Sequence, residues 1–272
     1  MTDETTTLLF PQWQGSGSPR ARHLRRGARQ LAEMLAVDLE VHVSADSETR
    51  AGILGRAQLF QQLNEARALL AQTKPTHLLT LGGDCSVDLA PASYLNARHK
   101  DLALVWLDAH ADLNTPASSP SGAFHGMILR TLLSEGDAEF IAAAFSTFEP
   151  EQVFLAGARD FDPPERAYAE RLEHLSVEVL ERQPKRLAER IEGRGFGKLH
   201  IHLDLDVLEP TFAATGYPTP GGLSVAGLVK LLGTLAERFE IVGVTLTEFM
   251  PTGEDDVEKV REVVRAVSSS LP

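Results

Sequence analysis

A chain of 272 residues, 43% of them hydrophobic, is long enough for one large domain or two small ones, and its composition excludes global disorder. The formal net charge of −12 disfavours nucleic acid and anionic membranes as partners, because both attract positive surfaces, and it suits a cationic ligand. A single cysteine excludes an internal disulfide, and the chain shows neither a signal-peptide pattern nor an apolar run of about 20 residues, so we expect a soluble, cytoplasmic protein.

Short apolar runs alternate with amphipathic helical patterns along the chain. Strands are predicted at residues 6–10, 39–44, 76–81, 102–107, 152–157, 199–205 and 241–246. Helices are predicted at residues 20–36, 57–72, 164–175, 225–239 and 255–270. This alternation predicts an α/β fold in which helices cover both faces of a mainly parallel sheet, and the short connections predict one domain over residues 1–272.

Three segments rich in proline, glycine and serine are predicted to be loops. They are residues 14–19, 115–123 and 215–222. In open parallel sheets, ligands bind at the carboxyl ends of the strands, where loops of this kind lie.

Polar side chains follow several of the predicted strands directly. They are Cys85 after 76–81, Asp108, His110 and Asp112 after 102–107, Asp204 and Asp206 in and after 199–205, and Glu248 after 241–246. If these strands are parallel neighbours, their carboxyl ends place all these groups along one edge of the sheet. In extended chain, residues i and i+2 point to the same side, so each group of alternating residues faces one site.

Carboxylates gathered at a buried edge repel one another, and a bound cation removes that repulsion. Any single aspartate after a strand is more often a turn or cap residue, and a lone histidine is more often a hydrogen-bonded core or surface group. The repetition of the pattern at two strand ends favours a metal site instead. Enough ligands for two divalent ions are present: Cys85, Asp108, His110, Asp112, Asp204 and Asp206.

The motifs "LGGDCS", "DAHADLNT", "SGAFHGM", "HLDLDVLEP" and "TEF" occur between residues 81 and 248. Their identity and order resemble the arginase, or ureohydrolase, family. The resemblance implies a three-layer αβα fold with a parallel sheet and a site for two Mn²⁺ ions. It also implies hydrolysis of the guanidino C–N bond of a small molecule by a metal-bridging hydroxide, with release of urea.

The resemblance further assigns roles to individual positions. Asp108 and Asp204 would bridge the two ions, and each ion would receive two more ligands: Cys85 and Asp112 on one, His110 and Asp206 on the other. The resemblance makes Asp108, Glu248 and His125 the catalytic residues. Glu248 would hold the guanidinium group by paired hydrogen bonds. His125 would transfer a proton to the leaving amine, which suits an imidazole, although by itself it is an ordinary loop histidine.

The segment "GARDFDPPE" (157–165) resembles the part of arginases that reads the α-amino group of the substrate. This resemblance implies that Asp162 and Glu165 contact that group. A second interpretation is that Asp162 and Pro163 occupy the N-cap and first position of a helix, and both readings can hold together. The positions that match those binding the substrate α-carboxylate are Asn114, Ser119 and Ser121.

Four features depart from the family pattern. Cys85 stands where most members have histidine, and a thiolate favours softer ions than manganese, so this cysteine is either a ligand for another metal or a small buried spectator. Glu209 replaces the usual aspartate, Ala123 replaces a common asparagine, and the 215–222 loop is about one residue shorter.

These departures leave several functions open. Cys85 and the sequence "VLEP" are similar to those of a branch of the family that hydrolyses Nω-hydroxy-L-arginine to hydroxyurea. The other motifs resemble those of enzymes acting on L-arginine. Agmatine and formiminoglutamate are further candidate substrates. A catalytically weak regulatory member of the family is the alternative from another class. Family members often form trimers or hexamers, so the resemblance also implies a homo-oligomer.

Overall fold

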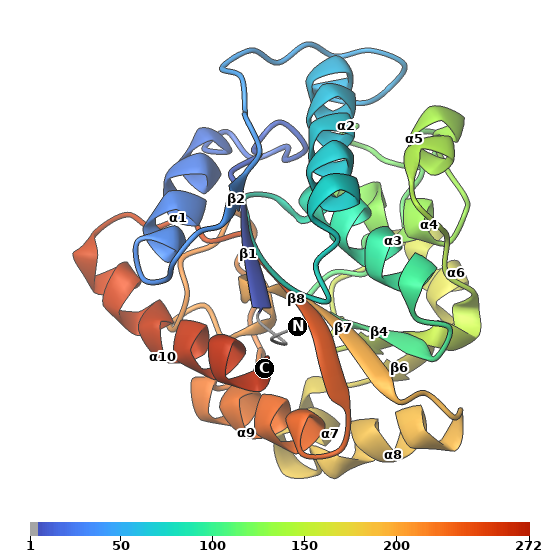
Figure 1. Ribbon diagram of the computed structural model, residues 1–272, viewed down its shortest axis with the longest axis vertical. Coiled ribbons are helices and arrows are strands. Elements are labelled where there is room, and N and C mark those ends of the chain that lie inside the picture. Colours follow the sequence, from blue (N-terminus) through green and yellow to red (C-terminus); the bar gives the residue numbers. More distant parts are fainter. Residues whose placement is uncertain (1–4) are drawn as a thin grey trace.

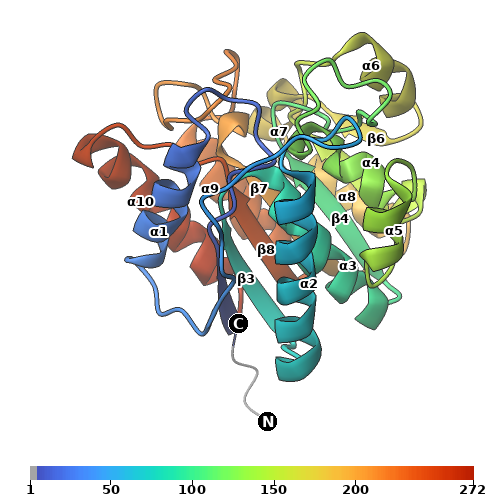
Figure 2. The same cartoon turned by 90° about the horizontal axis from the view of Figure 1, so that it is seen from above.

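The computed structural model describes residues 5–272 and places an eight-stranded sheet between helices (Figures 1 and 2). All neighbouring strands are parallel, in the order β2-β1-β3-β8-β7-β4-β5-β6. The strands are β1 Thr5–Phe10, β2 Leu39–Glu40, β3 His77–Gly82, β4 Leu102–Leu107, β5 Val153–Ala156, β6 Glu173–Leu175, β7 Lys198–Asp204 and β8 Glu240–Thr247. The predicted fold class is thereby confirmed.

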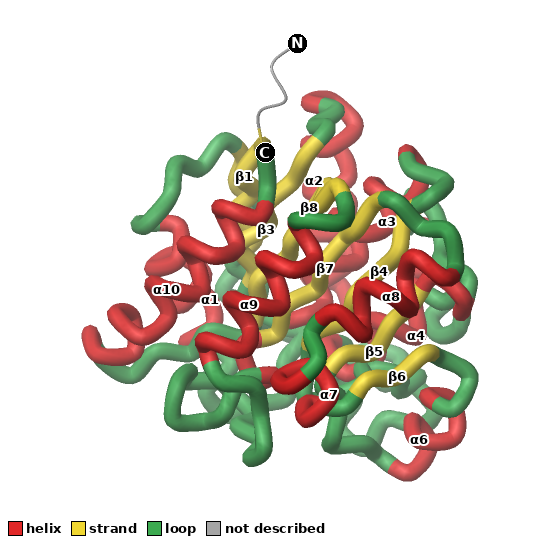
Figure 3. The backbone as a smooth tube through the Cα atoms, turned by 90° about the horizontal axis from the view of Figure 1, so that it is seen from below, coloured by secondary structure: helices red, strands yellow, loops and turns green. Residues whose placement is uncertain are grey.

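Helices pack against both faces of this sheet, so each face has its own apolar core. The helices are α1 Arg22–Ala32, α2 Arg56–Thr73, α3 Leu89–Arg98, α4 Ile128–Leu132, α5 Ala138–Ala143, α6 Pro163–Ala169, α7 Val177–Arg182, α8 Lys185–Gly193, α9 Val225–Ala236 and α10 Glu254–Ser270. Helices α2 to α5 contribute to one core and α7 to α10 to the other, while α1 contributes to both. Figure 3 shows α8, α9 and α10 lying across one face of the sheet.

Strands β3 and β4 are buried along their whole length, as expected for a parallel sheet that is covered on both faces. More important for function, β3, β8, β7 and β4 are consecutive neighbours in the sheet. These are the four strands that the sequence shows to be followed by acidic, imidazole or thiol side chains. Their carboxyl ends therefore lie side by side, at the edge where the predicted ligands emerge.

Several predicted boundaries were wrong, including the end of the helix predicted at 225–239, which stops at Ala236. The helix predicted at 164–175 ends at Ala169, and residues Glu173–Leu175 form the edge strand β6, which pairs with β5. The strand predicted at 39–44 pairs only over Leu39–Glu40, because the chain leaves the sheet edge there. Helix α1 is shorter at both ends than the predicted 20–36. Within residues 5–272, no helix combines the length and the apolar character needed to cross a bilayer.

Candidate active site

The turn after β3 is fixed by the chain that leaves β1. Gly83 has no room for a side chain, since a Cβ there would lie 1.6 Å from the carbonyl oxygen of Gln12. Asp84 then accepts hydrogen bonds from the backbone N–H of Gly15 (2.9 Å) and from Gln12 Nε2 (3.2 Å). These contacts hold the following residue, Cys85, at the start of a short 3₁₀ turn with its thiol buried at the sheet edge.

Two clusters of metal-ligating atoms at this edge share Asp108, and a third group consists of Cys85, His125 and Glu248. Ligand atoms of Cys85, Asp108, Asp112 and His202 lie within 4.8 Å of one another, as do those of Asp108, His110 and Asp206. Asp108 belongs to both clusters. Asp204 lies beside the first cluster, because its Oδ2 accepts a hydrogen bond from the thiol of Cys85 (3.0 Å). The structure thus brings together every residue that the sequence predicts as a metal ligand.

Asp204 and Asp206 each use one oxygen to hold the backbone at the strand ends. Asp204 Oδ1 accepts from the N–H of Asp206 (2.7 Å), and Asp206 Oδ1 accepts from the N–H of Ala109 (3.0 Å). Their other oxygens face the clusters: Asp204 Oδ2 lies beside Cys85, and Asp206 Oδ2 lies 2.9 Å from Nδ1 of His110. The turns therefore orient the carboxylates before any ligand binds.

The electrostatics of the clusters favour a cation. Burial, reinforced by neighbouring carboxylates, raises the pKa of Asp112 and Asp204 well above the ordinary value and raises the pKa of Asp206 to about 6. Burial likewise raises the pKa of the Cys85 thiol. A divalent ion would reverse these shifts, because it favours the ionised form of each ligand.

Unpaired buried atoms point to the same conclusion. Among the described residues, Asp112 Oδ2, Glu248 Oε2 and His202 Nε2 are buried without a hydrogen-bond partner, although such groups are normally paired in folded proteins. Asp112 and Glu248 also have left-handed backbones, with φ of 52° and 62°, a conformation that costs of order 1–3 kcal/mol and clusters at functional sites. The donor set of carboxylates, imidazoles and one thiol fits two divalent ions.

The predicted catalytic pair lies beside the clusters. Nδ1 of His125 is 3.3 Å from Oε1 of Glu248, and the backbone N–H of His125 donates to the carbonyl of Gly15 (3.1 Å). Burial alone would lower the pKa of His125, but the contact with Glu248 outweighs it and raises this pKa. The imidazole can therefore carry a proton near neutral pH.

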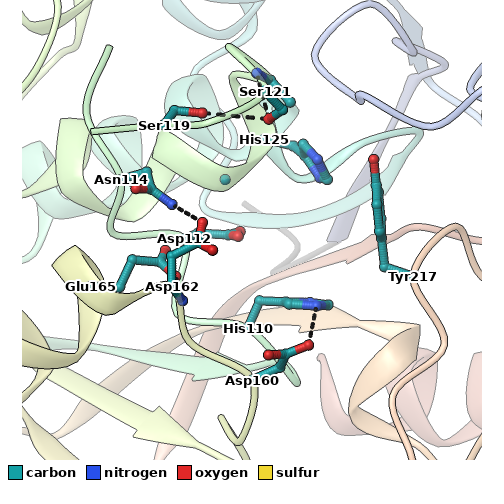
Figure 4. A pocket seen from close by; sticks show the side chains of 12 residues that line it. His110, Asp112, Asn114, Ser119, Ser121, His125, Asp160, Asp162, Glu165 and Tyr217 are labelled. Atoms are coloured by element: carbon teal, nitrogen blue, oxygen red, sulfur yellow. Dashed lines mark hydrogen bonds and ion pairs between the residues drawn. The ribbon is translucent and has the colours of Figure 1, made fainter. Parts of the chain in front are cut away.

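A pocket of about 260 Å³ opens over these groups (Figure 4). Its wall contains the five residues predicted to bind substrate, together with His110, Asp112 and His125. It also contains Asp160 and Tyr217, which the sequence analysis did not single out. The Tyr217 ring lies 5.3 Å from the ring of His125, and Asp160 Oδ2 lies 4.0 Å from Nε2 of His110. Tyr217 lies in an irregular loop without a sequence signal of its own, whereas Asp160 lies inside the "GARDFDPPE" segment, which could have pointed to it.

Asp162 and Glu165 form a capping box at the start of α6, so the helix-cap interpretation of this segment is correct. Both oxygens of Glu165 accept backbone hydrogen bonds, from Leu113 (2.8 Å) and Asp162 (2.9 Å). Asp162 Oδ2 in turn accepts from Nδ2 of Asn114 (2.9 Å). Glu165 therefore joins the 113–114 segment to α6, whereas Asp162 and Asn114 bind one another in the pocket wall.

Glu209, one of the departures from the family pattern, contacts the 215–222 loop. Glu209 Oε2 accepts from the N–H groups of Gly221 (2.8 Å) and Gly222 (3.0 Å). Arg159 donates to the carbonyls of Thr219 (2.6 Å) and Asp206 (2.9 Å), which ties the loop to the end of β7. Glu209 thus holds the loop that carries Tyr217.

Comparisons with known proteins agree with this architecture. The family model described as "Arginase family" matches residues 16–271. An arginase of Staphylococcus aureus (strain COL) is 32% identical over 203 residues, which cover 70% of this chain and 66% of that relative, so the match spans slightly less than two thirds of the relative. The structure of Entamoeba histolytica arginase in complex with L-ornithine superposes with a TM-score of 0.86 at 22% identity, covering 99% of this chain and 98% of that one. The structure of proclavaminate amidino hydrolase from Streptomyces clavuligerus superposes with a TM-score of 0.72 at 21% identity, covering 98% of this chain and 91% of that one. The chain belongs to the arginase family.

Proposed function

We propose that this protein is a binuclear-metal ureohydrolase that cleaves the guanidino C–N bond of L-arginine or a close analogue and releases urea. One observation carries the proposal: two ligand clusters share Asp108 and lie beside an acidic pocket lined by His125, whose Nδ1 contacts Glu248. The names of relatives in the same family support it, since the Staphylococcus aureus relative is called an arginase.

The two clusters would hold two Mn²⁺ ions, with Asp108, which belongs to both clusters, and the adjacent Asp204 among the ligands. Cys85 and Asp112 would complete one site, and His110 and Asp206 would complete the other. When bound, such ions supply Lewis acidity that ionises water near neutral pH. The thiol of Cys85 makes its site softer than the other, so it also suits zinc or iron.

Glu248 and His125 would act on the substrate itself. Glu248, whose Oε2 has no partner among the described residues, would accept two hydrogen bonds from the planar guanidinium group and fix it above the clusters. A hydroxide from water would add to the guanidinium carbon, the bond from this carbon to the alkyl nitrogen would break, and the added hydroxyl would lose its proton to solvent as the C=O bond forms. His125 would donate the proton that this nitrogen needs to leave as an amine, and the remaining fragment is urea.

The rest of the pocket suits an amino-acid substrate. Asp160 and Asp162 place negative charge where a cationic α-amino group would lie. Ser119 and Ser121 offer hydroxyl groups on the part of the wall away from Asp160, and Asn114, whose Nδ2 donates to Asp162, lies between these serines and Asp162; these polar groups fit a carboxylate (Figure 4). Agmatine lacks a carboxylate, so these donors favour arginine or Nω-hydroxy-L-arginine over agmatine.

The test is product release by the purified protein after loading with Mn²⁺. Urea or hydroxyurea is measured with L-arginine, Nω-hydroxy-L-arginine, agmatine and formiminoglutamate. We expect turnover of one of the two amino acids with an α-carboxylate and a guanidino group, and loss of both turnover and metal in Asp204→Ala. A protein that binds two ions yet turns over none of the four compounds would overturn the proposal in favour of a regulatory role.

A further inference from the structure

His202 has an unpaired nitrogen at the candidate metal centre. The side chain is fully buried on β7, and one of its ring nitrogens lies within 4.8 Å of ligand atoms of Cys85, Asp108 and Asp112. Nδ1 of His202 is engaged by Asp88 Oδ2 at 3.0 Å, whereas Nε2 has no hydrogen-bond partner among the described residues. The available nitrogen is therefore Nε2.

Asp88 fixes which nitrogen of His202 carries the proton. Its carboxylate contacts Nε2 of His200 (2.8 Å) and Nδ1 of His202 (3.0 Å), and it accepts from the hydroxyl of Thr245 (2.6 Å). Contacts of this kind favour the ionised carboxylate, which only accepts hydrogen bonds. In a neutral ring the proton then sits on Nδ1, and the lone pair of Nε2 is free. A carboxylate that holds the second nitrogen of a histidine is the usual support of a metal-bound imidazole.

The neighbouring strand fixes the orientation of the ring. His202 pairs with Trp106 across β7 and β4, and the two rings stack at 3.6 Å with an interplanar angle of 6°. The indole Nε1 of Trp106 also donates to Asp108 Oδ2 (3.1 Å). One tryptophan therefore positions both the carboxylate of Asp108 and the imidazole of His202. A metal ion bound here would meet donor atoms that are already held in place.

His200 provides an internal comparison. It lies on the same strand two residues earlier, is equally buried and contacts the same carboxylate. Its Nδ1 is also unpaired, but this atom packs against Gly243. A Cβ added to that glycine would lie only 2.6 Å from Nδ1 of His200. His200 is absent from every cluster of ligand atoms in the described residues. Only His202 faces the site.

We propose that Nε2 of His202 is a direct ligand of the ion held by Cys85 and Asp112, an inference that rests on the proposed function. This ion then has sulfur, nitrogen and oxygen ligands, while the ion at His110 and Asp206 has nitrogen and oxygen ligands alone. The two ions are thus bound by chemically different sites, and the imidazole of His202 supplies a strong donor beside the soft thiol.

The test compares Mn²⁺ binding by two matched variants and the full-length wild type. His202→Asn keeps an N–H group close to Asp88 but removes Nε2, and His200→Gln keeps an N–H group within reach of the same carboxylate. Titration calorimetry and metal analysis give the affinity and number of ions. We expect two ions in the wild type and in His200→Gln. In His202→Asn we expect one ion to be lost or weakened at least about tenfold.

Unchanged binding of both ions by His202→Asn would overturn the inference and leave the hydrolase proposal intact. Equal weakening in both variants would also overturn it, because the effect would then act through Asp88. If the wild type binds no Mn²⁺, both proposals fail. Should His202→Asn not fold, wild-type crystals soaked in Mn²⁺ decide the matter: an anomalous peak about 2.0–2.4 Å from Nε2 supports the assignment, and an ion beyond about 3 Å contradicts it.

Discussion

Asp112 illustrates how a single residue can be unfavourable for the fold and favourable for the site. It has a left-handed backbone, one oxygen without a partner, and a pKa raised by burial and by Asp108. All three features oppose folding of the metal-free chain. A bound cation would remove two of them, which explains why an ionisable residue stands there.

Replacement of Asp112 by asparagine should separate these two effects. Asparagine tolerates the left-handed backbone and carries no charge, so we expect the metal-free variant to be about 1 kcal/mol more stable than the wild type, or about 2–4 °C higher in melting temperature. Its affinity for Mn²⁺ should fall at least about tenfold. Calorimetry in EDTA and metal titration measure both, with the exposed Asp46→Asn as control. Lower stability without metal would contradict this account.

His125 carries a prediction of a different kind, because it lies outside the two ligand clusters formed around Asp108. His125→Asn should lower kcat by about 10²–10⁴-fold, the usual contribution of proton transfer, and leave two ions bound. Steady-state kinetics with metal analysis of the same sample provides the measurement. A variant that loses metal as well as activity would show that His125 holds the centre together instead of transferring a proton.

At the scale of elements, prediction succeeded where one pattern dominates. Buried parallel strands such as β4 have unbroken apolar runs, and the polar residues after them follow from the geometry of strand ends. It failed for β6, because Glu173–Leu175 continues the pattern of α6 in sequence and only pairing with β5 makes it a strand. His202 was missed for a related reason: in "HIHLD" it reads as strand interior, and its role depends on Cys85 and Asp112 from other segments.

Helix α6 combines a structural and a proposed binding function in Asp162, and these can be separated. Asp162→Asn keeps a good N-cap but removes the charge, whereas Asp162→Ala removes both. We expect the alanine variant to lose about 1 kcal/mol of stability and the asparagine variant little. Both should raise the KM for the amino-acid substrate more than that for agmatine. Equal effects on the two substrates would exclude Asp162 from recognition of the α-amino group.

At the scale of the whole molecule, one sheet unites the chain. Strand order brings the ends of β3, β8, β7 and β4 together although residues 82 and 248 lie far apart in sequence. Because every named strand belongs to this sheet, we propose that residues 5–272 fold as one domain and unfold in a single transition. The homo-oligomer implied by the family resemblance stays a prediction, which sedimentation of the purified protein would measure.

The acidic centre should also set how the stability of the whole protein depends on pH. Burial first, and neighbouring carboxylates second, raise the pKa of Asp206 from an ordinary 3.8 to about 6 and raise those of Asp112 and Asp204 further. A carboxyl whose pKa is higher in the folded state stabilises the fold below its unfolded pKa, and this contribution is lost as the pH rises through the folded value. Asp88 and Asp108 have lowered pKa values, so their titration affects stability below about pH 4.

The metal-free protein should therefore lose stability between about pH 4 and pH 8, by on the order of 2–3 kcal/mol for Asp206 alone. Mn²⁺ competes with protons for the same carboxylates, so the stabilisation it gives should grow over the same range. Melting temperatures measured across this range in EDTA and in Mn²⁺ should diverge with rising pH, and Asp206→Asn should reduce the divergence. Parallel curves would mean that the strand-end carboxylates do not bind the ion, and the metal centre on which the proposed chemistry depends would have to be abandoned.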